Sequence, residues 1–121
     1  MAIPSGSGTE VLKSKLTVAV VNSFQDVVEQ LNNANKLIIV LSIIIHEGSG
    51  ASGHKFIMQI VDNDGSSNPC YLYEDFAVGS VETFVHNDKF CLVGDKRLMI
   101  KSTSPSSNFD VTATYIIQDW T

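Results

Sequence analysis

The longest apolar stretch of the chain runs from Leu37 to Ile45 and is interrupted only by Ser42. It is rich in β-branched residues, which favour a strand over a helix, and it is much shorter than the roughly twenty apolar residues that a membrane-spanning helix needs. An apolar run without alternation is typical of a strand that is covered on both sides. We therefore expect residues 37–45 to form a central strand, buried on both faces, around which the rest of the chain packs.

Further strands are predicted from alternating positions on either side of this run. Residues 10–21 place Leu16, Val18 and Val20 on one side and Thr17, Ala19 and Val21 on the other, so both faces of this strand are expected to be covered. Residues 27–31 fit either a helical turn or a short strand. The remaining predicted strands lie at residues 56–61, 70–78, 81–85, 90–93, 97–101 and 110–118.

Loops rich in Gly, Asn, Asp and Ser separate these strands, and the strongest turn signal is Asp62-Asn63-Asp64-Gly65. About eight short strands at even spacing, without a clear helix, are typical of an antiparallel β-sandwich of the jelly-roll or Greek-key kind. A closed barrel is the main alternative. We expect residues 1–9 to form an extended N-terminal arm and residues 10–121 a single β-sandwich domain, a size that can fold without disulfides or metals.

The arm Met1–Gly8 consists mostly of small residues and has no periodicity. Such a segment is expected to be flexible alone and to become ordered along a neighbouring subunit. A linker left from cloning is the other explanation of this composition. Trp120, one residue from the C-terminus, is expected to be a packing anchor within the subunit or across to another.

Charge argues against a nucleic-acid partner, because the net charge is −5 and the eight basic residues are scattered. Met1–Leu12 lacks the basic start and apolar segment of a signal peptide, and no stretch is long enough for a membrane helix, so a reducing cytosol is the expected site of synthesis. Cys70 and Cys91 lie in predicted strands, where buried free thiols are favoured over a disulfide.

Catalysis finds little support in the sequence. A cysteine nucleophile would need Cys70 or Cys91 to lie beside a histidine that acts as the base, and the candidates are His46, His54 and His86. None of these cysteines and histidines belongs to a recognisable catalytic motif. Because Cys-x-x-Cys and His-Glu-x-x-His are also absent, we expect no enzymatic activity, no cofactor and no metal.

The segment Asp62–Ser66 is similar to the start of a calcium loop, because oxygen-bearing side chains alternate in a tight turn. An EF-hand is excluded, since its glycine would fall at the sixth position instead of the fourth and its acidic twelfth position is occupied by Tyr73. A hairpin turn explains the segment better than a surface cation site. The aromatic residues Tyr71, Tyr73, Phe76 and Trp120 could form a sugar-reading or peptide-reading face, although for most of them a place in the core or at an interface is the simpler interpretation.

The opening Ile3-Pro4-Ser5-Gly6-Ser7-Gly8-Thr9-Glu10-Val11-Leu12-Lys13 resembles that of small virion structural proteins of tailed bacteriophages, especially those infecting marine and cyanobacterial hosts. The order of elements is similar too, with the strand 38–45, the strand 55–61 closed by Asp62–Gly65, the returning Tyr71–Tyr73 and the final 110–115. The resemblance covers nearly the whole chain, and residues 21–30 depart from it.

The resemblance implies a non-enzymatic β-sandwich on the virion, such as a capsid decoration (cement) protein that binds the major capsid protein and stabilises its lattice. It also implies a homotrimer whose terminal arms reach across joints, made in the host bacterial cytoplasm and placed on the capsid surface. The alternative is a tail, baseplate or fibre component that attaches to the host, with glycan bound at Tyr71, Tyr73 or the loop 48–53. The expected partner-binding residues are Ile3, Pro4, Ser5, Thr9, Val11, Leu12 and Trp120.

Overall fold

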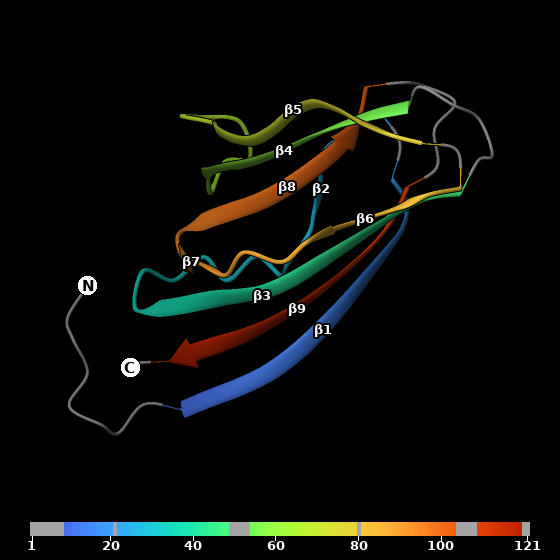
Figure 1. Cartoon of the computed structure of the whole chain (residues 1–121). Coiled ribbons are helices and arrows are strands. Elements are labelled where there is room, and N and C mark those ends of the chain that lie inside the picture. Colours follow the sequence, from blue (N-terminus) through green and yellow to red (C-terminus); the bar gives the residue numbers. More distant parts are fainter. Residues whose placement is uncertain (1–8, 21, 49–53, 80, 104–108, 120–121) are drawn as a thin grey trace.

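The computed structural model describes residues 9–20, 22–48, 54–79, 81–103 and 109–119, which form two antiparallel sheets packed face to face (Figure 1). Sheet A has the order β1-β9-β3-β6, and β7 pairs with another part of the β3 edge that β6 pairs with. Its strands are β1 (Thr9–Val20), β9 (Phe109–Asp119), β3 (Lys36–Glu47), β6 (Thr83–His86) and β7 (Phe90–Val93). Sheet B has the order β2-β8-β4-β5, made of β2 (Gln25–Asp26), β8 (Lys96–Ser102), β4 (His54–Asp62) and β5 (Cys70–Val78).

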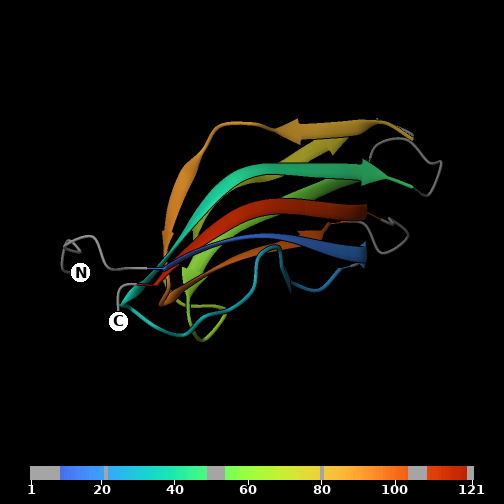
Figure 2. The same cartoon turned by 90° about the horizontal axis from the view of Figure 1, so that it is seen from below.

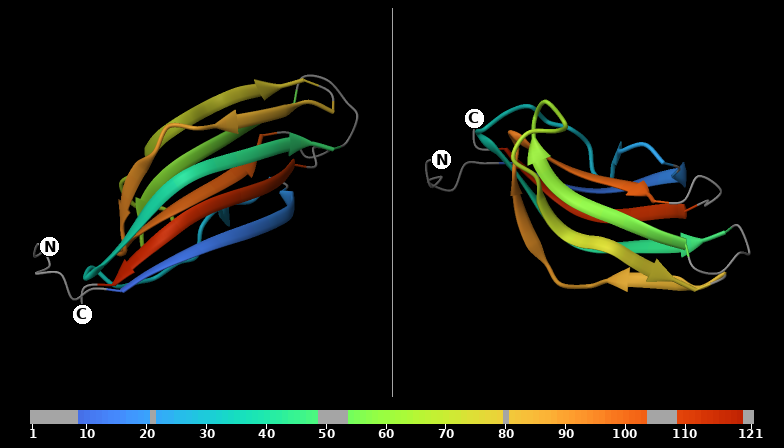
Figure 3. Two further views of the ribbon diagram at one scale, coloured as in Figure 1. Left: turned by 60° about the horizontal axis from the view of Figure 1, so that its bottom comes forward. Right: turned by 90° about the horizontal axis from the view of Figure 1, so that it is seen from above.

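The topology is that of a jelly roll. β6 and β7 pair with successive parts of β3, so together they act as one interrupted strand. Counting them as one leaves eight strands in two Greek keys, in which β4 and β5 are neighbours in sheet B and each of the other steps along the chain crosses to the opposite sheet. Figure 3 shows the two sheets from two sides. The predicted antiparallel jelly-roll sandwich is therefore confirmed, and the closed barrel is wrong because the described strands form two separate sheets.

A β-bulge in β3 explains the long apolar run at the centre of the sequence. The register with β9 shifts between Val40 and Ser42, so Ile38 and Val40 before the bulge point into the core together with Ile43 and Ile45 after it. The extra residue at the bulge shifts the inward-facing positions by one, so the sequence lacks the apolar–polar alternation that marks a strand buried on one face only. The prediction of burial on both faces is wrong, since Ile44 on the opposite face is 41% exposed.

Aromatic rings hold the two sheets together at one end of the core. Phe56 of β4 is fully buried, with its ring centroid 5.5 Å from that of Phe76, 5.9 Å from that of Phe109 and 6.1 Å from that of Phe84. Tyr73 of β5 packs in the same cluster, 5.7 Å from Phe56. Because Phe84 and Phe109 belong to sheet A, the cluster links the sheets through tilted and edge-on ring contacts, which are the favoured geometries.

The segment between β1 and β3 closes one side of the sandwich. It contains only two strand residues, Gln25 and Asp26, which pair with Ile100 and Met99 of β8. Val27 and Val28 are buried, and the Val27 amide donates a hydrogen bond to the Leu98 carbonyl. Of the two sequence-based interpretations of residues 27–31, neither a helical turn nor a strand forms there; the short strand lies just before them.

Candidate interaction surface

The outer face of sheet A, turned away from sheet B, is apolar along two rows that cross the strands. One row runs from Leu16 through Thr112 and Ile44 to Val85, and the other from Leu12 through Ile116 and Ile39 to Cys91. Between them lie Ser14, Thr114 and Ser42. No ionisable side chain other than the Cys91 thiol stands in these rows. We call this surface the outer apolar face; its residues are Leu12, Leu16, Ile39, Ile44, Val85 and Ile116.

Exposure of these side chains is high for apolar residues. Leu12 is 67% exposed, Leu16 63%, Val85 50% and Ile44 41%. Val18, also on β1, is 60% exposed. The prediction that residues 10–21 are covered on both faces is therefore wrong. Exposed apolar side chains that gather on one face often mark an interaction site, so this face is the candidate interaction surface.

β1 forms one margin of sheet A, as the view from below shows (Figure 2). Among the described residues, its backbone pairs with β9 alone, from Thr9 opposite Asp119 to Val20 opposite Phe109, with a register shift after Thr17. The backbone groups on the other side of this strand are therefore available to a further strand.

A small hollow lies on the inner side of β1, next to its first residues. Three apolar side chains line it, namely Val11, Leu31 and Ile117, and two ion pairs stand at it. Lys13 Nζ lies 2.8 Å from Glu29 Oε1, and Lys36 Nζ lies 3.5 Å from Asp119 Oδ2. Since charges of both signs are already paired here, the hollow offers no strong attraction to an anion or a cation.

Glu29 links the connecting segment to both β1 and β9. Its carboxylate accepts hydrogen bonds from Lys13 and, at 3.1 Å, from the Tyr115 hydroxyl. The Lys13 ammonium lowers the pKa of Glu29, while burial raises the pKa of Tyr115. These contacts fix the inner side of β1, so its outer side and its edge are the parts left open.

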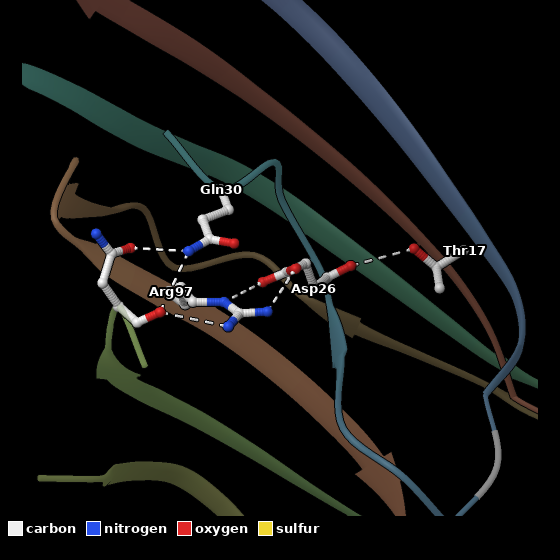
Figure 4. Close-up of polar contacts among 5 residues, drawn as sticks. Thr17, Asp26, Gln30 and Arg97 are labelled. Carbon is white, nitrogen blue, oxygen red and sulfur yellow. Dashed lines mark hydrogen bonds and ion pairs between the residues drawn. The ribbon is translucent and has the colours of Figure 1, made fainter. Parts of the chain in front are cut away.

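A polar network below β1 joins the connecting segment to β8 (Figure 4). Arg97 donates from Nε and Nη2 to the two carboxylate oxygens of Asp26, each at 3.0 Å. Gln30 donates to the carbonyl and side-chain oxygens of Asn63, and the Thr17 hydroxyl donates to the Asp26 carbonyl. The groups satisfy one another, so the network is structural and presents no open site.

The Asp62–Gly65 turn forms as the sequence predicted. The Gly65 amide donates to the Asp62 carbonyl, and Gly65 has a φ of 82°, a conformation that glycine adopts without strain. Asp64 accepts hydrogen bonds from Ser66 and Ser67, which lower its pKa to about 2. The carboxylates of this turn accept hydrogen bonds within the turn or from Lys96, so the hairpin interpretation accounts for the segment. The described residues contain no cluster of metal ligands.

The candidate catalytic residues are used in structural contacts. His54 is buried with its Nδ1 3.1 Å from Glu47, His46 contacts the Thr83 hydroxyl, and His86 contacts the Tyr73 hydroxyl at 2.7 Å. Cys70 and Cys91 are free, as predicted, but both are exposed, so the prediction of buried thiols is wrong. Cys70 lies in β5 and Cys91 in β7, which are both edge strands, and their side chains are exposed to solvent.

Of the predicted partner-binding residues, the structure places Thr9, Val11 and Leu12 together at the start of β1, all exposed. Ile3, Pro4, Ser5 and Trp120 lie outside the described residues. Tyr71 and Tyr73 do not form a shared face, because Tyr73 packs in the aromatic cluster while Tyr71 is 49% exposed. Sequence reasoning missed Leu16, Ile44 and Val85: it predicts that the strands of Leu16 and Ile44 are covered on both faces, and it assigns no face to Val85.

Neither a known protein family nor a curated protein matches this chain. Solved structures match its fold. The VP2 subviral particle of infectious bursal disease virus superposes with a TM-score of 0.58 at 7% identity, covering 96% of this chain and 34% of that one. T=1 particles derived from the same virus give a TM-score of 0.51 at 7% identity, with 96% and 37% covered.

A second kind of assembly protein has the same fold. The disulfide-linked pili of Bacillus endospore appendages match with a TM-score of 0.54 at 11% identity, covering 100% of this chain and 97% of the pilus subunit. The chain thus spans about a third of the viral capsid proteins but nearly the whole pilus protein. At these identities the likeness establishes the fold: an all-β jelly-roll sandwich shared with capsid and pilus proteins. Among the described residues no helix is long and apolar enough to cross a membrane.

Proposed function

We propose that this chain is a non-enzymatic structural protein of a bacteriophage particle, and in particular a capsid decoration protein that binds the major capsid protein. The observation that carries the proposal is the outer apolar face, which runs across four strands of sheet A and reaches 67% exposure at Leu12. The jelly-roll fold shared with viral capsid proteins supports it, as does the resemblance of the N-terminal stretch to phage virion proteins.

The structure suggests how such a protein would stabilise a lattice. The two sheets form a rigid body because their core is continuous and the aromatic cluster links them. Burying the outer apolar face against a capsid subunit would contribute roughly 25 cal/mol for each Å² of apolar area removed from water. Residues 1–8 would add contact area along a neighbouring subunit, and several such attachments around the lattice would reinforce one another.

Binding to particles that lack this protein tests the proposal. Ile44→Lys places a charge in the middle of the outer apolar face, where the side chain can still reach solvent in the free protein. Tyr71→Lys is the matched control, because Tyr71 has similar exposure but belongs to sheet B. We expect the wild type and Tyr71→Lys to load onto capsids in hundreds of copies and Ile44→Lys to load poorly. Equal loading of both variants, or no loading of the wild type, contradicts the proposal.

A filament or fibre subunit is the second candidate, which includes a tail or baseplate component. The whole-length match to a pilus protein favours it, and the exposed thiols of Cys70 and Cys91 would allow links between subunits in an oxidising environment. Copy number separates the two candidates, since decoration requires hundreds of copies on the capsid and a tail part only a few. Glycan binding by such a component would depend on Tyr71, because Tyr73 is used in the core.

A further inference from the structure

The four sheet margins of the described structure differ in how open they are to another strand. β2 contains two residues, and β6 and β7 contain four each and are separated by an irregular stretch. β5 is longer, but its pairing with β4 has two register shifts, and Asp75 within it has a φ of 50°. Short, interrupted and bulged strands are the devices by which proteins close their sheet margins.

β1 has none of these devices over its first half. Of its twelve residues, those from Thr9 to Thr17 pair in continuous register with β9, and the register shifts only after Thr17. Its side chains Lys13 and Lys15 point inward, which is one way to discourage pairing; Lys13 is held in an ion pair with Glu29 at 2.8 Å, so a further strand has only to avoid placing lysines opposite each other. Leu12 and Leu16 on the outward side are more than 60% exposed, whereas Ile39 and Ile116 of the same face, in strands with neighbours on both sides, are half-buried. Leu12 and Leu16 are more exposed because β1 has a neighbour on one side only among the described strands.

We infer that β1 pairs antiparallel with β1 of a second copy, joining the two A sheets into one. A second copy of this chain is the partner we infer, because it carries the same long and regular edge strand. Its other described sheet margins are short or bulged, so β1 is the strand that it can offer for pairing. Pairing a strand with itself closes on a two-fold axis and uses both open margins at once. The inference does not depend on the proposed virion role, and it differs from the threefold arrangement that the phage resemblance implies.

Charge narrows the choice of register for this pairing, and the exposure of Leu12 completes the choice. Like charges directly opposite each other destabilise a sheet, which disfavours an axis at Ser14, where Lys13 would face Lys15, and at Lys13, where it would face itself. With the axis at Leu12, the two Leu12 side chains are opposite, Glu10 faces Ser14, Val11 faces Lys13 and Thr9 faces Lys15. This register covers the most exposed large apolar side chain described, Leu12.

Disulfide trapping tests the register directly. Cys70 and Cys91 are first replaced by serine, which both tolerate because they are exposed; Leu12→Cys or Leu16→Cys is then added. Opposed residues in an antiparallel pair are close enough for a disulfide, whereas the two copies of residue 16 would be about 26 Å apart along the strands, eight residues at about 3.3 Å each. The two leucines share one strand, one face and nearly equal exposure, so Leu16→Cys controls for random collision.

We expect Leu12→Cys to form a covalent dimer at least about tenfold faster than Leu16→Cys under mild oxidation, because paired thiols have a high effective concentration. Sedimentation of the wild type should show a monomer–dimer equilibrium. Equal cross-linking of the two variants, a monomer at every concentration, or a trimer overturns the inference. A dimer that ignores capsids would support this inference while contradicting the proposed function, so the two can fail separately.

Discussion

Arg97 and Asp26, 71 positions apart in the chain, form a two-pronged ion pair that fixes β2 to β8, with both hydrogen bonds at 3.0 Å. Their side chains are 18% and 21% exposed, so the pair is largely withdrawn from water. The Asp26 carboxylate raises the pKa of Arg97 further above its ordinary value. The pair holds the connecting segment in place, and that segment in turn supports the inner side of β1.

Replacing this arginine tests the contribution of the paired geometry. Arg97→Lys keeps the charge but cannot make two parallel hydrogen bonds to a carboxylate, so we expect a loss of about 1–2 kcal/mol in the free energy of unfolding, measured in urea. In an Asp26→Asn background the same change should cost much less. An equal cost in both backgrounds would show that the two residues are not coupled.

The aromatic cluster predicts a large effect at Phe56. Phe56→Ala removes a fully buried ring that contacts residues of both sheets, and we expect a loss of about 3–5 kcal/mol. Val85→Ala, on the outer apolar face, should change stability by about 0.5 kcal/mol or less, because that side chain is half exposed in the isolated chain. Comparable losses in the two variants would place Val85 in the core of a stable assembly.

Gly94 lies so close to backbone atoms at the start of β3 and in the loop before it that a side chain there should destabilise the fold. A Cβ at this position would lie 2.2 Å from the Asn33 carbonyl oxygen and 2.8 Å from that of Lys36, both of which belong to the backbone. We expect Gly94→Ala to cost about 1–3 kcal/mol in thermal or urea unfolding. Gly79→Ala is the control, because its Cβ would meet only the movable end of Glu82. A mild Gly94→Ala variant would mean that the loop before β3 shifts freely.

Acid stability should depend on Asp64. Its pKa in the folded chain is about 2 against an ordinary 3.8, because Ser66 and Ser67 donate hydrogen bonds to the ionised carboxylate. A group with a lowered pKa stabilises the fold above its ordinary pKa and loses that contribution as pH falls through the folded value. We expect Asp64→Asn to unfold at a lower temperature than the wild type at pH 6, with the two midpoints converging as the pH approaches 2. A constant difference down to pH 2 would assign the effect to something other than ionisation.

The two thiols should react in the folded protein. Because Cys70 and Cys91 are exposed and unpaired, a coloured disulfide reagent should modify both without denaturant. The single variants Cys70→Ser and Cys91→Ser should each lose half of the signal. Protection of Cys91 alone, relieved by dilution, would indicate that the outer apolar face is covered by another molecule, since Cys91 stands at the end of one of its rows.

Much of the fold follows from local sequence. Gly, Asn and Asp clusters mark the turns, and Asp62–Gly65 forms the predicted tight turn because glycine at position 65 adopts a positive φ without a Cβ clash. Strand character is equally local, since apolar and polar residues alternate along β9 and short apolar runs mark β4 and β8. The sequence by itself therefore determined an all-β antiparallel sandwich.

Which residues face a partner was decided only by the tertiary structure. Apolar character at Leu16, Ile44 and Val85 does not reveal whether a second layer covers them, because an uncovered apolar face and a doubly covered strand have the same local pattern. The bulge after Val40 depends on the pairing of β3 with β9, which lies over 60 residues further along the chain. Burial depends on where the sheets pack, a property of contacts between distant segments, so the sequence could predict the strands but not the open face of sheet A.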